Sequence, residues 1–168
     1  PETTETPLET ISGVWDVSFQ PDRGAPAKIT IDNLASWTEN TDPGVKYFSG
    51  TGTYTKTISA AESWFENNRQ LCLDLGSVRN IAEVTVNGKY LGIVWKRPFR
   101  LNVTDVLKPG ENSLEIKVTN LWVNRLIGDQ QPDITKQYSY TTQAFYQADS
   151  PLLVSGLLGP VKVISLKE

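Results

Sequence analysis

Apolar and polar residues alternate in short segments along most of the chain. Ala82, Val84 and Val86, for example, alternate with polar partners. This two-residue period is typical of a β-strand with one buried face. The pattern predicts strands at residues 13–19, 27–31, 47–58, 70–75, 81–86, 90–95, 99–103, 114–118 and 161–166. Because the strands are many and short and almost no helical period occurs, the predicted fold is an all-β sandwich.

Turn-forming residues separate the predicted strands. The pair Asn87-Gly88 tolerates positive φ at both central positions and predicts a tight type I′ hairpin. The run Pro109-Gly110-Glu111-Asn112 predicts a second reversal, before the strand at 114–118. Ser59 and Glu62 have the spacing of a capping box, which predicts a short helical turn at that point.

One long segment does not follow the pattern. Between Asn120 and Pro160 the sequence has little hydrophobic period of either kind. Structureless segments longer than about 12–15 residues are uncommon in compact domains and tend to be functional or interfacial. We therefore expect the functional surface in this segment.

The length of 168 residues fits one domain that can bury a substantial core. Residues 1–7 are polar and predict a linker, which places the folded domain at residues 8–168. The sequence has no methionine and no signal-peptide pattern, so we expect a fragment of a larger multidomain protein. No segment approaches the roughly 18 apolar residues that a membrane helix requires, and no membrane partner is expected.

Charge and residue usage exclude several classes of function. The net charge of −3 argues against a nucleic-acid partner, which would require a basic face. The absence of histidine excludes a Ser-His-Asp triad, a Cys-His pair and an imidazole zinc site. Cys72 is the single cysteine, so the chain has no internal disulfide, and strand alternation predicts that it lies on the opposite face from Leu71 and Leu73.

Several motifs, in order along the chain, resemble the sugar-binding domain of glycoside hydrolase family 2. They are Gly13-Val14-Trp15-Asp16-Val17, residues 46–54, Leu73-Asp74-Leu75-Gly76, Val86-Asn87-Gly88 with Leu91-Gly92, Pro98-Phe99, residues 107–112 and Ser155-Gly156-Leu157-Leu158. A further set is similar to the C-terminal β-sandwich of the α-L-rhamnosidases of family 106. This set comprises Tyr47-Phe48-Ser49-Gly50, Trp95-Lys96, Asn120-Leu121-Trp122, residues 124–129 and Asp149-Ser150-Pro151.

The resemblance implies a galactose-binding-domain-like jelly roll and a non-catalytic role. Enzymes of this kind keep their catalytic carboxylates on a separate barrel domain, so the implied partners are that barrel and a carbohydrate. Their usual location implies a periplasmic or secreted protein. Three hypotheses remain: an accessory domain that braces the barrel of an α-L-rhamnosidase-like hydrolase, an autonomous carbohydrate-binding module, and a purely structural sandwich.

The segment 122–129 contains the candidate site residues, namely Trp122, Asn124, Arg125 and Asp129. Asn supplies a donor and an acceptor, Arg a planar fork of donors and Asp a pair of acceptors, a combination that suits vicinal sugar hydroxyls. Gly128 is expected to let a loop turn sharply beside them. Family resemblance implies that this loop leans toward the active site of the barrel. The alternative is a structural Arg125–Asp129 pair that orders the loop.

The remaining candidates are aromatic residues and carboxylates. Trp15 and Trp95 are predicted to be core residues, whereas Trp37, Trp64 and Trp122 are predicted to be freer. Tyr138, Tyr140, Phe145 and Tyr146 would cap the sandwich or form an apolar seam against the catalytic domain. The nineteen carboxylates are predicted to be solvated, with none catalytic. No cofactor is expected; galactose-binding-like sandwiches often hold a structural calcium ion, but no Asp-x-Asp-x-Asp-Gly run occurs here.

Overall fold

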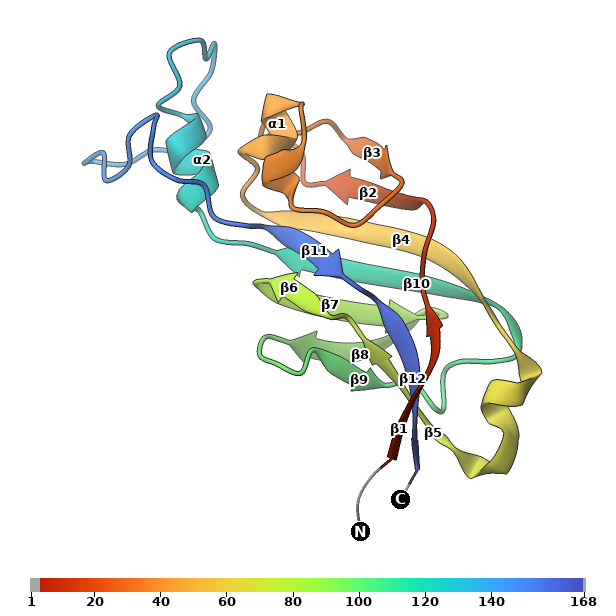
Figure 1. Ribbon diagram of the computed structural model, residues 1–168. Helices are drawn as coiled ribbons and strands as arrows, with labels where there is room; N and C mark the ends of the chain where they lie inside the picture. Colours follow the sequence, from red (N-terminus) through yellow and green to blue (C-terminus); the bar gives the residue numbers. More distant parts are fainter. Residues whose placement is uncertain (1–3, 168) are drawn as a thin grey trace.

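The computed structural model describes residues 4–167, which form a β-sandwich with two short helices (Figure 1). The elements, in order, are β1 (Thr4–Thr10), β2 (Trp15–Phe19), β3 (Lys28–Ile31), η1 (Trp37–Glu39), α1 (Pro43–Lys46), β4 (Thr51–Ala60), η2 (Glu62–Asn68), β5 (Gln70–Asp74), β6 (Ser77–Arg79), β7 (Ile81–Val86), β8 (Lys89–Val94), β9 (Arg100–Asn102), β10 (Gly110–Thr119), α2 (Val123–Gly128), β11 (Gly156–Gly159) and β12 (Lys162–Lys167). The predicted all-β sandwich is confirmed.

The larger sheet has six strands in the order β3-β2-β4-β10-β7-β8. Its centre is the antiparallel pair β4–β10, which is in register from Thr51 opposite Thr119 to Ala60 opposite Gly110. Alternation along these two strands buries Tyr54 and Ile116 completely. The predicted hairpin joins β7 to β8, with φ of 50° at Asn87 and 78° at Gly88.

The second layer is a four-stranded sheet in the order β1-β12-β5-β9, accompanied by the two-stranded pair β11–β6. Leu71 and Leu73 on β5 and Val163 on β12 are buried in the core between the layers. Cys72 is also buried, and desolvation raises the pKa of its thiol, which disfavours the reactive thiolate.

The linker predicted for residues 1–7 is wrong at residues 4–7, which belong to strand β1. Thr4 to Thr10 pair with Lys167 to Lys162, with an irregularity between Pro7 and Glu9. Their side chains are mostly exposed because β1 is an edge strand, and this explains why the segment lacks an apolar period. Residues 1–3 of the predicted linker lie outside the described residues.

Three of the five tryptophans are placed differently from the predictions. Trp37 and Trp64 were expected to be freer, but they are buried at 4% and 6% exposure. Trp37 packs edge-to-face on Phe19 and Phe48, with ring centroids 5.6 and 5.3 Å away. Trp95 was expected in the core but is 66% exposed, because it follows β8 at the edge of the larger sheet.

The capping box predicted at Ser59 is also wrong. Ser59 is the penultimate residue of β4, and Ala61 precedes η2 without a side-chain capping bond. The pairing of β4 with β10 continues to Ala60, so tertiary sheet contacts override the local capping signal.

Candidate functional site

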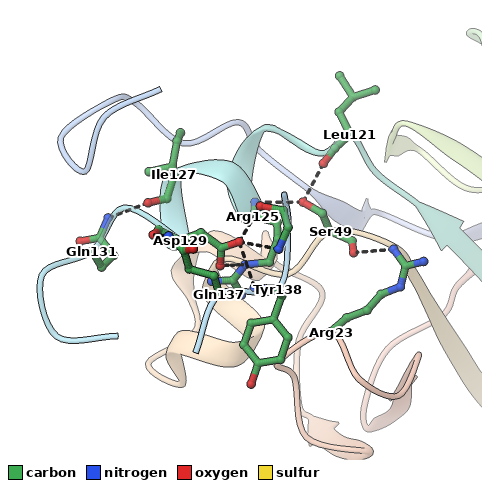
Figure 2. Close-up of polar contacts among 10 residues, drawn as sticks. Arg23, Ser49, Leu121, Arg125, Ile127, Asp129, Gln131, Gln137 and Tyr138 are labelled. Carbon is green, nitrogen blue, oxygen red and sulfur yellow. Dashed lines mark hydrogen bonds and ion pairs between the residues drawn. The ribbon is translucent and has the colours of Figure 1, made fainter. Parts of the chain in front are cut away.

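The segment predicted to be a loop at 122–129 instead contains helix α2, which follows the last residues of β10. Asn120 fixes the exit from the sheet, because its side chain accepts from Gly50 N and donates to Phe48 O, each at 2.9 Å. Ser49 Oγ then donates to Leu121 O at 2.9 Å and accepts from Arg125 N at 3.0 Å (Figure 2). These contacts hold the first turn of α2 against the chain that precedes β4.

Gly128 has a different role from the one predicted. It is the last residue of α2 and does not have a positive φ. A Cβ atom at this position would lie 2.5 Å from Tyr47 Cβ and 2.5 Å from Arg125 Nη2. The glycine is therefore required by close packing of the helix and not by a sharp turn.

Asn124 is buried, with 1% exposure, and both polar atoms of its carboxamide are hydrogen-bonded within the chain. Its Nδ2 donates to Leu153 O at 2.7 Å, and its Oδ1 accepts from Leu153 N at 2.8 Å. The two bonds connect α2 to the chain just before β11. We refer to residues 130–155, which lie between α2 and β11 and contain no helix or strand, as the arm.

Arg125 of α2 and Asp129, the residue that follows α2, form a buried ion pair one turn apart. Arg125 Nε donates to Asp129 Oδ1 at 2.9 Å, and the two side chains are 5% and 3% exposed. The second oxygen of Asp129 accepts from Tyr138 N, Ser139 N and Ser139 Oγ at 3.0, 2.7 and 2.5 Å. Asp129 therefore fastens the first half of the arm to the helix, as the structural alternative predicted (Figure 2).

The fastened arm projects from the sandwich beside α2, at the end remote from the chain termini (Figure 1). A further bond, from Gln131 Nε2 to Ala148 O at 2.9 Å, links the two halves of the arm. Tyr140 and Phe145 are 89% and 74% exposed. The arm is thus tied down internally, yet it presents two large aromatic side chains outward.

Trp122 lies on the outside of the structure, unlike the other three candidate residues. It is 51% exposed, and the Arg23 guanidinium lies 5.0 Å from its ring centroid. Leu121, Leu153 and Val154 are also exposed, and we call these three residues with Trp122 the α2 patch. The patch has two halves, one just before α2 and one at the end of the arm. Asn124 of α2 links them, since its side chain hydrogen-bonds the main chain of Leu153.

A cavity of about 390 Å³ opens between α1, α2 and the start of the arm. Arg125 lines it from α2, Lys46 and Tyr47 line it from the end of α1, and Lys136 and Tyr138 line it from the arm. Sequence reasoning did not associate Lys46, Tyr47 or Lys136 with Arg125. No sequence spacing signals this association, because the contributing segments are about eighty residues apart and meet only through tertiary packing.

Across residues 4–167, no group of three or more His, Cys, Asp or Glu side chains is arranged to hold a metal ion. No helix in the described range is long and apolar enough to cross a membrane.

Comparisons with known proteins agree with this architecture. Residues 35–149 match the family described as glycosyl hydrolase 2 galactose-binding domain-like. The solved structure of a rhamnosidase from Novosphingobium sp. PP1Y is similar over 96% of this chain and 15% of the rhamnosidase, with 46% identity and a TM-score of 0.92. The β-glucuronidase of Ruminococcus gnavus shares the fold, at 20% identity and a TM-score of 0.68 over 97% of this chain and 28% of the enzyme.

A relative from Formosa agariphila, named "Putative beta-glucuronidase", is 45% identical over 94% of this chain. The chain spans only 16% of that protein and 15% of the rhamnosidase.

Proposed function

Because the chain belongs to the glycosyl hydrolase 2 galactose-binding-like domain family, we propose that it is a non-catalytic accessory domain that braces the catalytic domain of an α-L-rhamnosidase-like hydrolase. The similarity to the Novosphingobium rhamnosidase over 96% of this chain supports that specificity. The small share of both relatives that the chain covers supports a role beside a larger catalytic part. The periplasmic or secreted location that the resemblance implies belongs to the same proposal.

The observation that carries the proposal is the combination of a fastened arm with exposed aromatic side chains. Asn124 and Asp129 hold the arm by internal hydrogen bonds, while Tyr140 and Phe145 are largely exposed to solvent. Ordering the arm in advance lowers the entropic cost of docking it against another surface. Large aromatic residues are also enriched in the buried centres of interfaces. We infer that Tyr140, Phe145 and the α2 patch contact the catalytic domain.

In this arrangement Asn124 and Asp129 would act on the carbohydrate site indirectly, by positioning the arm. Their hydrogen-bonding atoms are already used within the chain, whereas Trp122 is half exposed and Arg125, although buried, lines the cavity. We propose that these two residues make the contacts with sugar or with the neighbouring domain.

The test uses a full-length hydrolase that contains this chain, with the double variant Tyr140→Ser/Phe145→Ser. The isolated chain should keep its melting temperature, because both side chains are exposed. The full-length enzyme should show a lower melting temperature or a lower kcat/KM, because interface contacts are lost. Tyr90→Ser, at a 56% exposed residue of β8, is the matched control and should leave both proteins unchanged.

Equal behaviour of the double variant and the control in the full-length enzyme would refute the bracing role. Saturable binding of neutral glycans by the isolated chain, lost on substitution of exposed aromatic residues, would instead support the autonomous carbohydrate-binding module.

A further inference from the structure

The cavity lined by Arg125, Lys46 and Lys136 has an excess of positive charge. Among residues 4–167 the only carboxylate that lines it is Asp133, and the nearby Asp129 carboxylate is already paired with Arg125. Across residues 4–167, no carboxylate lies within 4.0 Å of the ammonium group of Lys46 or Lys136. The chain as a whole has a net charge of −3, so this cationic cluster is a local feature.

Arg125 offers unused hydrogen-bond donors to this cavity. Its side chain is 5% exposed and its Nε is bonded to Asp129, yet Nη1 and Nη2 have no hydrogen-bond partner among residues 4–167. Nη1 lies close to Gly24 and Nη2 close to Gly128. A Cβ atom added to Gly24 would lie 3.1 Å from Nη1, and one added to Gly128 would lie 2.5 Å from Nη2. A buried guanidinium with two free nitrogens is a strong site for a planar, two-oxygen acceptor.

The ring of Tyr138 contacts two cations. The Arg125 guanidinium carbon lies 5.1 Å and the Lys136 ammonium nitrogen 5.0 Å from the centroid of this ring, whose face attracts each of them. Lys46 lines the same cavity. Three cationic side chains and a single lining carboxylate among residues 4–167 favour a negatively charged ligand.

We propose that this cavity binds the carboxylate of a uronic acid sugar, with Arg125 Nη1 and Nη2 donating to the two oxygens and Lys46 and Lys136 adding charge. This inference rests on the proposed role in a glycoside hydrolase and names the ligand class of the Arg125 site. The cavity volume of about 390 Å³ lies within the usual range for small-molecule sites. Gln131, Thr135 and the Tyr47 ring, which also line it, supply the polar groups and aromatic face that a pyranose requires.

The test is a titration of the 168-residue chain with sodium glucuronate. Binding is monitored by NMR through the backbone amide chemical shifts of Gly24, Gly128, Lys136 and Tyr138. Glucose serves as the uncharged comparison at equal concentration, and sodium chloride controls for ionic strength. We expect saturable shifts with glucuronate, a dissociation constant of about 1–10 mM, and no matching shifts with glucose.

Two lysine substitutions supply the matched variants. Lys136→Gln and Lys46→Gln should each weaken glucuronate binding by roughly three- to tenfold, the range of one partly exposed charge contact. Lys89→Gln, at an exposed lysine of the β7–β8 hairpin, should leave binding unchanged. These variants avoid Arg125, whose buried ion pair makes loss of folding an expected side effect.

Identical shifts with glucose and glucuronate, or glucuronate binding that Lys136→Gln and Lys46→Gln do not weaken, would overturn the inference. A response to a Glu-rich peptide but not to glucuronate would also overturn it and assign the cavity to an acidic segment of a neighbouring domain. Failure of the titration leaves the bracing role intact, because that role is tested by Tyr140 and Phe145 in the full-length enzyme.

Discussion

The carboxamide of Asn124 hydrogen-bonds both backbone polar groups of Leu153, donating to its carbonyl at 2.7 Å and accepting from its N–H at 2.8 Å. This two-bond contact spans 29 residues of sequence and joins α2 to the end of the arm. The Asn124 residue is buried, with 1% exposure. Asn124 therefore holds the end of the arm, as Asp129 holds its first half.

Asn124→Asp should destabilise the fold by about 1–3 kcal/mol, because a carboxylate has no N–H to donate and leaves the Leu153 carbonyl without its partner. Urea unfolding of the variant and the wild type measures this difference. Asn33→Asp makes the same chemical change at an exposed position and should alter stability by no more than about 0.5 kcal/mol. Equal unfolding midpoints for the two variants would contradict the structural role of Asn124.

Asp129→Asn should cost about 3–5 kcal/mol, because it leaves the buried Arg125 guanidinium without a counter-charge. The substitution also replaces a charged acceptor of three hydrogen bonds from the arm with a weaker one. Hydrogen exchange at the Tyr138 and Ser139 amides should accelerate more than exchange in β4 and β10. Asp149→Asn, at an exposed residue of the same arm, is the control; similar exchange in both variants would contradict the prediction.

Much of the sandwich follows from local sequence rules, and the hairpin at Asn87-Gly88 shows why. Alternation fixes the inward face of β7, and two positive φ angles fix the turn, so both features are determined within a few residues. Helix α2 was missed although one local signal was present. Arg125 and Asp129 have the i, i+4 spacing of a helical ion pair, but the six-residue helix is too short to show an apolar period.

The tryptophans show what local rules do not determine. Trp37 lies in a single 3₁₀ turn without a periodic pattern, and its burial arises because the turn crosses over Phe19 and Phe48. Trp95 follows an apolar strand that proves to be the sheet edge, where no neighbouring strand covers it. Strand order and crossing segments depend on long-range packing. The cavity around Arg125 was missed for the same reason.

Substitution of the buried Trp37 and of the exposed Trp95 should change the free energy of unfolding by very different amounts. Trp37→Ala removes a side chain that packs against Phe19 and Phe48 and should cost about 3–5 kcal/mol. Trp95→Ala removes a side chain that is 66% exposed and should change stability by less than about 0.5 kcal/mol. Thermal unfolding of both variants checks the prediction, and a larger loss at Trp95 than at Trp37 would contradict the placement of both residues.

Arg100 links β1 to β5 and should give the fold an acid-sensitive contact. Its Nη1 and Nη2 donate to the Glu5 carboxylate at 2.7 and 3.1 Å, and its Nε donates to Asp74 at 2.7 Å. The hydrogen bonds from Arg100 lower the pKa of Glu5 below its ordinary value of about 4.3. A carboxylate with a lowered folded-state pKa stabilises the fold above the unfolded pKa, and this stabilisation is lost as the pH falls through the folded pKa.

The stability advantage of the wild type over Glu5→Gln should therefore be constant at neutral pH and disappear as the pH falls below about 4.3. Unfolding at several pH values and low ionic strength measures this difference, which added salt should reduce because Glu5 is exposed. Glu9→Gln removes an exposed carboxylate of the same strand that has no ion pair among residues 4–167, and it is the control for the loss of one negative charge at neutral pH. An advantage for the Glu5 wild type that grows on acidification would show that the Arg100 contact does not lower the pKa of Glu5 in solution.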